Sequence, residues 1–196
     1  MNCFDGASIY LKLGFEHILD LGGYDHILFV VALCAIYKLA QWRQVIILVT
    51  AFTIGHSLTL ALSTMDIFRM NPDLIETLIP VTILITALSN LRLRGELPDP
   101  AHQRIRYFLA LFFGLIHGLG FSNYLIALLG KEACITGPLL MFNIGLELGQ
   151  LIIVAAVLLL SWVVLTVRGV PRKMWNFAVS GLVTFLSIYL LVMKLV

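Results

Sequence analysis

Six long apolar runs constrain the fold of this chain more than any other feature of its sequence. An α-helix needs about 20 apolar residues to cross a hydrocarbon core of about 30 Å. Because hydrocarbon offers no partner for backbone N–H and C=O groups, each run is expected to form a helix that satisfies them internally. The sequence therefore predicts an all-α, polytopic membrane bundle with six transmembrane helices. The runs cover residues 24–40, 44–65, 73–92, 105–129, 138–167 and 174–195.

The composition agrees with this class of protein. The 196 residues are 60% hydrophobic and 12% charged, whereas soluble domains contain about 25% charged residues. No long polar stretch remains that could build a separate aqueous core. We therefore expect a single transmembrane domain over residues 1–196, in contact with membrane lipid.

A shorter segment precedes the six runs. Residues 7–20 have helical periodicity that includes His17 and Ile18, and two glycines, Gly22 and Gly23, follow them. Because the segment is too short for an ordinary span, it is predicted to be an interfacial or re-entrant helix, which brings the total to seven helices. The alternative is a tilted seventh crossing, which would reverse the expected side of the N-terminus.

The basic residues predict the orientation. Nine of the 13 Lys and Arg residues fall in three short connections, at 38–43, 92–106 and 168–173. Connections of this kind are cytoplasmic by the positive-inside rule. With six spans, both termini are then extracytoplasmic. The same rule explains the basic connections without a nucleic-acid partner, and His102 is expected to be a solvated loop residue.

Polar side chains interrupt the apolar runs. A charged residue at bilayer depth costs roughly 2.5 to 3.5 kcal/mol, so such residues are expected to face the protein interior and to neutralise one another or an ion. Position along the spans places five of them in the outer half of the membrane and two near its middle. In that order they are Asp25, His26, Glu76, Asn143, Glu147, His56 and His117. The sequence therefore predicts one site that opens to the extracytoplasmic side.

Local spacing adds detail to this site. Asn143 and Glu147 are four residues apart and share a helix face, and Gly145 and Gly149 are expected to clear space around Glu147. Asp25 either lines the site or accepts a hydrogen bond from a neighbouring imidazole and orients it. Imidazole and carboxylate ligands without thiolate suit a divalent transition metal such as nickel, cobalt or zinc. Proton handling and hydrogen bonding between helices are the alternatives.

Five strings in this order resemble the HupE/UreJ family of bacterial membrane proteins. They are GFEHI at 14–18, GGYDHILF at 22–29, TAFTIGHSLTL at 50–60, GLIHGLGF at 114–121 and FNIGLELGQ at 142–150. The resemblance implies a multi-pass protein of the bacterial inner membrane, associated with nickel or cobalt supply to hydrogenase and urease. It also implies a set of candidate metal ligands. The set is His17, Asp25, His26, His56, Glu76, His117, Asn143 and Glu147.

Three classes of function remain open at this point. The first, favoured by the resemblance, is a nickel/cobalt-type permease. The second is an intramembrane zinc-type hydrolase or transferase at the outer leaflet, in which Glu147 or Glu76 would act as general base on a zinc-bound water. The third is a metal sensor or assembly partner without turnover.

The three cysteines give a separate expectation. Cys34 lies inside the first predicted span and is expected to be a buried thiol. Cys3 and Cys134 both map to the outer side, where a disulfide between them and two free thiols are alternatives.

Overall fold

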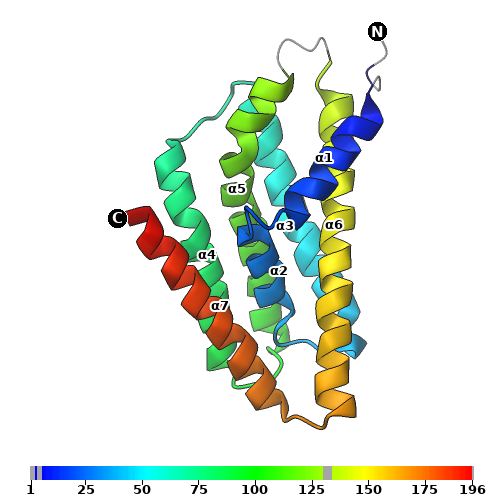
Figure 1. The fold of residues 1–196 in the computed structure, drawn as a ribbon, viewed down its shortest axis with the longest axis vertical. Helices are drawn as coiled ribbons and strands as arrows, with labels where there is room; N and C mark the ends of the chain where they lie inside the picture. Colours follow the sequence, from blue (N-terminus) through cyan, green and yellow to red (C-terminus); the bar gives the residue numbers. More distant parts are fainter. Residues whose placement is uncertain (1–2, 4–5, 130–133, 196) are drawn as a thin grey trace.

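The computed structural model describes residues 3, 6–129 and 134–195, and this part of the chain contains helices and no strand (Figure 1). The predicted all-α class is therefore confirmed. The α-helices are α1 (Ala7–Leu19), α2 (Asp25–Cys34), α3 (Trp42–Thr64), α4 (Pro72–Arg92), α5 (Pro100–Leu129), α6 (Thr136–Trp162) and α7 (Arg172–Leu195). A 3-10 turn, η1 (Leu39–Gln41), leads into α3, and a π turn, η2 (Val163–Val167), ends α6.

Five of these segments are long and apolar enough to cross a membrane. They are Leu39–Thr64, Pro72–Arg92, Pro100–Leu129, Thr136–Val167 and Arg172–Lys194. They correspond to five of the six predicted spans. The connection before the fourth predicted span is shorter than the expected 92–106, because α5 already begins at Pro100. Asp99 caps this helix by accepting hydrogen bonds from Ala101 N and His102 N.

The predicted first span, 24–40, differs from a single long helix. Only Asp25–Cys34 is helical, and these 10 residues extend about 15 Å. The backbone after α2 is satisfied by tertiary partners instead. Arg172 Nη2 donates to the Ile36 carbonyl at 2.5 Å, and Ser161 Oγ donates to the Tyr37 carbonyl at 3.3 Å. The first predicted span is thus a short helix, α2, that follows another short helix, α1.

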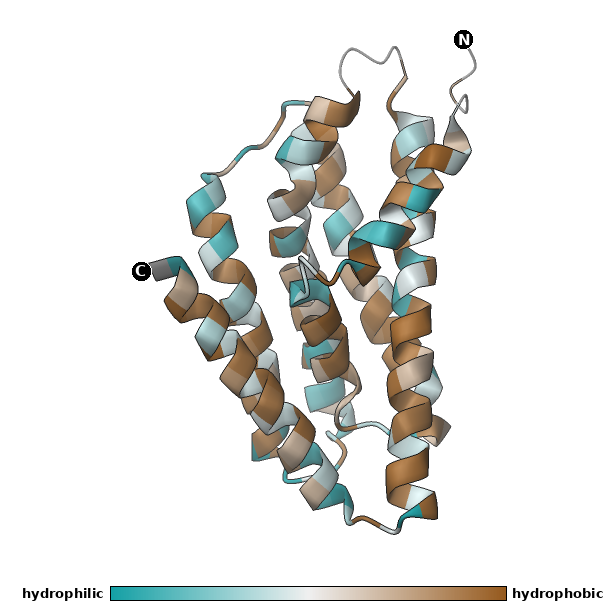
Figure 2. Ribbon diagram, in the orientation of Figure 1, coloured by the Kyte–Doolittle hydropathy of each residue, from teal (hydrophilic) through white to brown (hydrophobic). Residues whose placement is uncertain are grey.

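The two short helices are arranged one after the other along the bundle (Figure 1). α1 packs along α6, whereas α2 packs against α4 and α6. The connection between them turns where Asp20 Oδ1 accepts a hydrogen bond from Gly22 N at 2.8 Å. Figure 2 shows hydrophilic residues at this break, at mid-height of an otherwise largely hydrophobic bundle.

Glycines set the closest helix contacts. A Cβ at Gly145 would lie well under 3.0 Å from the Leu11 carbonyl oxygen, and one at Gly149 would overlap the Ile18 side chain. Both glycines therefore allow α1 to pack closely against α6. The expectation that they clear space around Glu147 is wrong, since their missing side chains face the other helix.

Glycines also allow close packing between α3 and α5. A Cβ at Gly55 would meet the Leu111 carbonyl, and a Cβ at Gly114 would meet the Phe52 carbonyl, each well under 3.0 Å. Backbone oxygens cannot be moved as cheaply as the ends of side chains. These two glycines therefore fix how closely α3 and α5 approach each other.

Gly114→Ala is expected to lower the free energy of unfolding by about 1 to 3 kcal/mol, the usual cost of overpacking. The added methyl group has to push α3 away from α5 at the Phe52 carbonyl. Gly181→Ala on α7 is the matched control, because nothing lies within 4 Å of a Cβ there. Thermal unfolding in detergent measures both variants, and equal midpoints would contradict this account of the α3–α5 contact.

The ends of the bundle differ in chemistry. At the end that holds the connections 35–41, 93–99 and 168–171, buried Arg106 donates to Asn90 Oδ1 at 2.9 Å, and Asn90 Nδ2 donates to the Ala32 carbonyl at 2.6 Å (Figure 1). At the other end, Cys3 is disulfide-bonded to Cys134, with 5.4 Å between their Cα atoms. Cys34 is a buried free thiol, as predicted.

Candidate metal site

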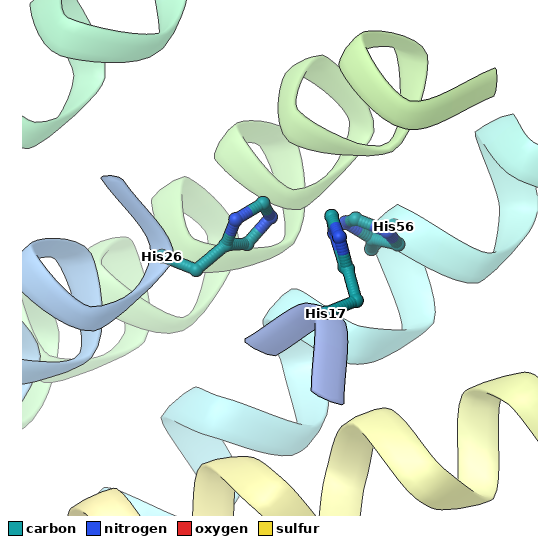
Figure 3. A group of neighbouring side chains, drawn as sticks. All are labelled: His17, His26 and His56. Atoms are coloured by element: carbon teal, nitrogen blue, oxygen red, sulfur yellow. The ribbon is translucent and has the colours of Figure 1, made fainter. Parts of the chain in front are cut away.

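Three histidines from three helices meet at the break between α1 and α2. His17 is in the last turns of α1, His26 is in the first turn of α2, and His56 is in the middle of α3. One ligand nitrogen from each lies within 4.8 Å of the others. Figure 3 shows the three rings converging from their separate helices. Residues 39 positions apart in sequence thus form one group.

His117 of α5 extends this group to a fourth helix. Its ring centroid lies 5.1 Å from that of His26. The side chains of His56 and His117 are fully buried, and that of His26 nearly so. The close α3–α5 contact at Gly55, Gly114 and Gly118 brings His56 and His117 into the same layer of the bundle. We refer to His17, His26, His56 and His117 as the histidine cluster.

Two hydrogen bonds determine which ring nitrogens are available. Asp25 Oδ1 lies 3.0 Å from His26 Nδ1 and also accepts from the His26 backbone N–H at 2.8 Å. A carboxylate accepts, so His26 Nδ1 carries the proton and Nε2 presents a lone pair. This hydrogen bond is compatible with the predicted role of Asp25 as an acceptor that orients an imidazole.

His117 is held in a similar way. The Thr82 hydroxyl donates to the Ile79 carbonyl at 2.7 Å and lies 2.9 Å from His117 Nε2. Because its one hydrogen is directed to Ile79, the hydroxyl is left to accept from His117 Nε2–H. The lone pair of His117 then lies on Nδ1.

Five other nitrogens of the cluster are buried and have no partner among the described residues. His17 Nε2, His26 Nε2, both ring nitrogens of His56, and His117 Nδ1 are buried and unpaired. A buried polar atom without a hydrogen bond costs about 1 to 3 kcal/mol. Imidazole nitrogens with exposed lone pairs are ligands for a borderline divalent cation, so the cluster fits such an ion.

A cavity of about 720 Å³ leads to the cluster. His17, His26, His117 and Asp25 line its inner part, and Phe121 lies against His17 with 3.9 Å between ring centroids. His56 lies behind these residues and does not reach the cavity wall.

Glu76 lies at the rim of this cavity. It sits in the second turn of α4 and forms an ion pair with Lys194 at the end of α7. About half of each side chain is exposed, at 47% and 48% respectively. Glu76 therefore faces the same cavity as the histidine cluster but already has a cationic partner.

Asn143 and Glu147 lie elsewhere. They line a separate groove of about 560 Å³ between α3 and α6, in which Thr50 Oγ1 donates to Glu147 Oε1 at 2.7 Å. The face of α6 that carries them is turned toward α3, while Gly145 and Gly149 on another face receive α1. The structure thus brings six of the eight predicted site residues to the histidine cluster and its cavity, and puts two in another groove.

Thr82 and Lys194 make contacts at the site that their sequence positions do not indicate. Thr82 holds His117, and Lys194 neutralises Glu76. Neither stands out in sequence, because a threonine in an apolar helix and a lysine near the end of one are both common. The fifth histidine, His102, is exposed at the start of α5, where its Nδ1 lies 2.6 Å from Asp99 Oδ2. It is not a member of the histidine cluster.

Comparisons with known proteins agree with the motifs. A family model described as HupE / UreJ protein matches residues 2–194. Searches of curated proteins and of solved structures give no match.

Proposed function

We propose that this chain, which belongs to the HupE/UreJ family, is a permease for a divalent transition metal of the nickel or cobalt type. Family membership implies a membrane protein that takes part in nickel or cobalt handling. That it transports the metal is our inference. The observation that carries it is the convergence of unpaired imidazole nitrogens from four helices at the break between α1 and α2. In this role the metal is the cargo and the histidine cluster is its binding site.

The chemistry of the cluster favours such a cargo. Neutral imidazoles bind nickel, cobalt and zinc, whereas hard cations prefer oxygen ligands. His26 and His117 are already oriented by Asp25 and Thr82, so little rotamer freedom is lost on binding. The Asp25 carboxylate lies next to the cluster and offsets part of the ion's charge in this buried region.

The discontinuity between α1 and α2 also favours transport. Secondary transporters commonly bind their substrate near the membrane midplane, between broken helices. The cavity reaches the cluster between α1, α4, α5 and α7. On the other side the rings of Phe29 and Phe52 pack with 4.7 Å between centroids, next to His117. Release would therefore require a movement of helices that opens this aromatic layer.

The side of entry follows from the basic connections. We propose that the end of the bundle with the connections 35–41, 93–99 and 168–171 is cytoplasmic, in a bacterial inner membrane. The disulfide-bonded Cys3 and the cavity rim at Glu76 are then extracytoplasmic. This agrees with the disulfide, because disulfides are stable in an oxidising compartment. The protein would take up metal from outside.

A second candidate function has one observation in its favour. The cavity of about 720 Å³ is larger than an ion with its hydration waters needs, at about 30 Å³ per water. A zinc ion on three histidines could activate a water toward a substrate bound there. Of the two carboxylates predicted as general base, Glu76 faces this cavity and Glu147 faces the α3–α6 groove. Glu76 would therefore be the base.

Uptake measurements separate the two functions. Proteoliposomes that contain the purified protein are expected to accumulate radioactive nickel or cobalt with saturable kinetics, and His56→Ala should reduce the initial rate to that of empty liposomes. His102→Ala, which changes an exposed histidine outside the cluster, is the control and should leave the rate unchanged. Metal that binds to the protein without accumulating inside would contradict the permease and support the enzyme.

A further inference from the structure

The groove between α3 and α6 has a chemistry different from that of the histidine cluster. Its polar wall consists of oxygen-bearing side chains: Thr50, Thr53, Ser57, Thr136, Asn143 and Glu147. Among the described residues that line it, there is no histidine and no lysine or arginine. Oxygen ligands without nitrogen or sulfur suit a hard cation and not the metals that imidazole prefers.

The hydrogen bonds of the groove leave specific oxygens free. Thr50 Oγ1 donates to Glu147 Oε1 at 2.7 Å, so its own lone pairs remain available. Ser57 Oγ donates to the Thr53 carbonyl at 2.7 Å, and Thr53 Oγ1 donates to Gln150 Oε1 at 2.7 Å. The hydroxyl hydrogens are thus directed to Glu147 and Gln150 of α6 and to the Thr53 carbonyl of α3. Each hydroxyl oxygen keeps lone pairs that can accept a hydrogen bond or bind a cation.

Two further oxygens are buried and have no partner within the described part of the chain. They are Glu147 Oε2 and Asn143 Oδ1, which lie on one face of α6 because the residues are four apart. The free amide oxygen and the free carboxylate oxygen need a donor or a cation, since a buried acceptor left unpaired costs about 1 to 3 kcal/mol. Nothing in the described helices supplies it.

Charge balance decides which cation would fit. Glu147 is the single ionisable side chain on the described wall of the groove, and it makes no ion pair with a described residue. A lone charge at bilayer depth is expensive. A monovalent cation would make the groove neutral, whereas a divalent ion would leave an uncompensated positive charge there.

The groove also provides access and room. It runs from Met65 and Thr136, at the end of the bundle with the disulfide, down to Glu147, which lies 11 residues or about 17 Å further along α6. Its volume of about 560 Å³ holds a cation and several waters, at about 30 Å³ each.

From these observations we infer that Glu147, Asn143 and the hydroxyl of Thr50 form a second cation site, which takes a monovalent alkali cation through oxygen ligands only. The site is separate from the histidine cluster and does not depend on the permease proposal. Where the permease operates, an ion bound here would provide a second gradient to which movement of the α3 and α6 helices can be linked.

Direct binding tests the inference. Purified protein in detergent, in choline buffer at constant pH and ionic strength, is titrated with radioactive sodium and, in a second series, with radioactive rubidium. Saturable binding of about one ion per chain by either is expected. Glu147→Gln, which keeps the shape and an acceptor for Thr50, should abolish it.

Two control variants make the result specific. Glu76→Gln removes a carboxylate at the rim of the other cavity, and His56→Ala removes a member of the histidine cluster. Both should bind the alkali cation with unchanged affinity. Retention in His56→Ala also separates this site from the proposed function, because metal uptake is lost in that variant.

The opposite results are equally clear. Absence of saturable binding of both ions, or binding by Glu147→Gln equal to that of the unaltered protein, would overturn the inference. Should Glu147→Gln fail to give a monodisperse protein, Asn143→Ala is measured instead, for which at least tenfold weaker binding is expected and unchanged affinity would overturn it. A proton in place of the alkali cation would give the first of these negative results.

Discussion

Replacing His56 with alanine is expected to lower the affinity of the protein for nickel or cobalt by at least about 100-fold. His56 is fully buried, and neither of its ring nitrogens has a hydrogen-bond partner among the described residues. A side chain that supplied only packing or a helix-to-helix hydrogen bond would not leave both nitrogens unpaired. Groups that merely orient a ligand already contribute about 10- to 100-fold to metal affinity, so loss of a ligand should cost at least as much.

Metal content after equilibration with each ion and removal of excess measures this effect. His117→Ala should behave like His56→Ala, because His117 Nδ1 is equally buried and unpaired. His102→Ala is the matched control, since it removes an exposed histidine at the start of α5. Unchanged metal content in both cluster variants would refute the metal site itself, for the permease and for the enzyme alike.

Asp25→Asn is expected to weaken metal binding by about 10- to 100-fold without loss of the fold. The carboxylate accepts from His26 Nδ1 at 3.0 Å and so directs the lone pair of Nε2 toward the cluster. A neutral amide accepts this hydrogen bond more weakly than a carboxylate does. The substitution also removes the negative charge that offsets part of the charge of the bound ion. Asp25 acts as a positioning residue in this account.

The measurement combines affinity with a spectroscopic signal. Bound cobalt absorbs in the visible range, and a changed orientation of His26 should shift its bands, which a purely structural defect elsewhere would not do. Asp73→Asn is the control, because Asp73 is an exposed carboxylate in the first turn of α4. Equal affinity and an equal cobalt spectrum for Asp25→Asn and the unaltered protein would show that Asp25 does not position His26.

Most of the fold was predictable because membrane helices follow from local composition. Five of the six predicted spans correspond to helices of the structure, and the short helix α1 occurs where its periodicity indicated. The first span was the exception. Apolar length alone could not reveal that α2 ends after only 10 residues, or that Arg172 and Ser161, far along the chain, donate hydrogen bonds to the carbonyls of Ile36 and Tyr37.

The residues of the candidate site could be proposed from the sequence, but which of them lie together could not. The cost of polar groups in hydrocarbon marks His26, His56, His117 and Glu147 in the sequence. It does not say which of them meet. Asn143 and Glu147 share a depth with the histidines but point to another groove, since each residue turns about 100° around a helix and the rotation of α6 is set by its contact with α1.

The sequence by itself therefore determined the class of protein, five of its long helices and the chemical types of its polar residues, because a helix in lipid satisfies its own backbone. Only the tertiary structure decided which nitrogens of His26 and His117 stay unpaired, which residues share a cavity, and that Glu147 lies apart from the histidine cluster. Those properties depend on hydrogen bonds and helix faces contributed by other segments of the chain, and on the close approach that glycines such as Gly114 and Gly145 allow.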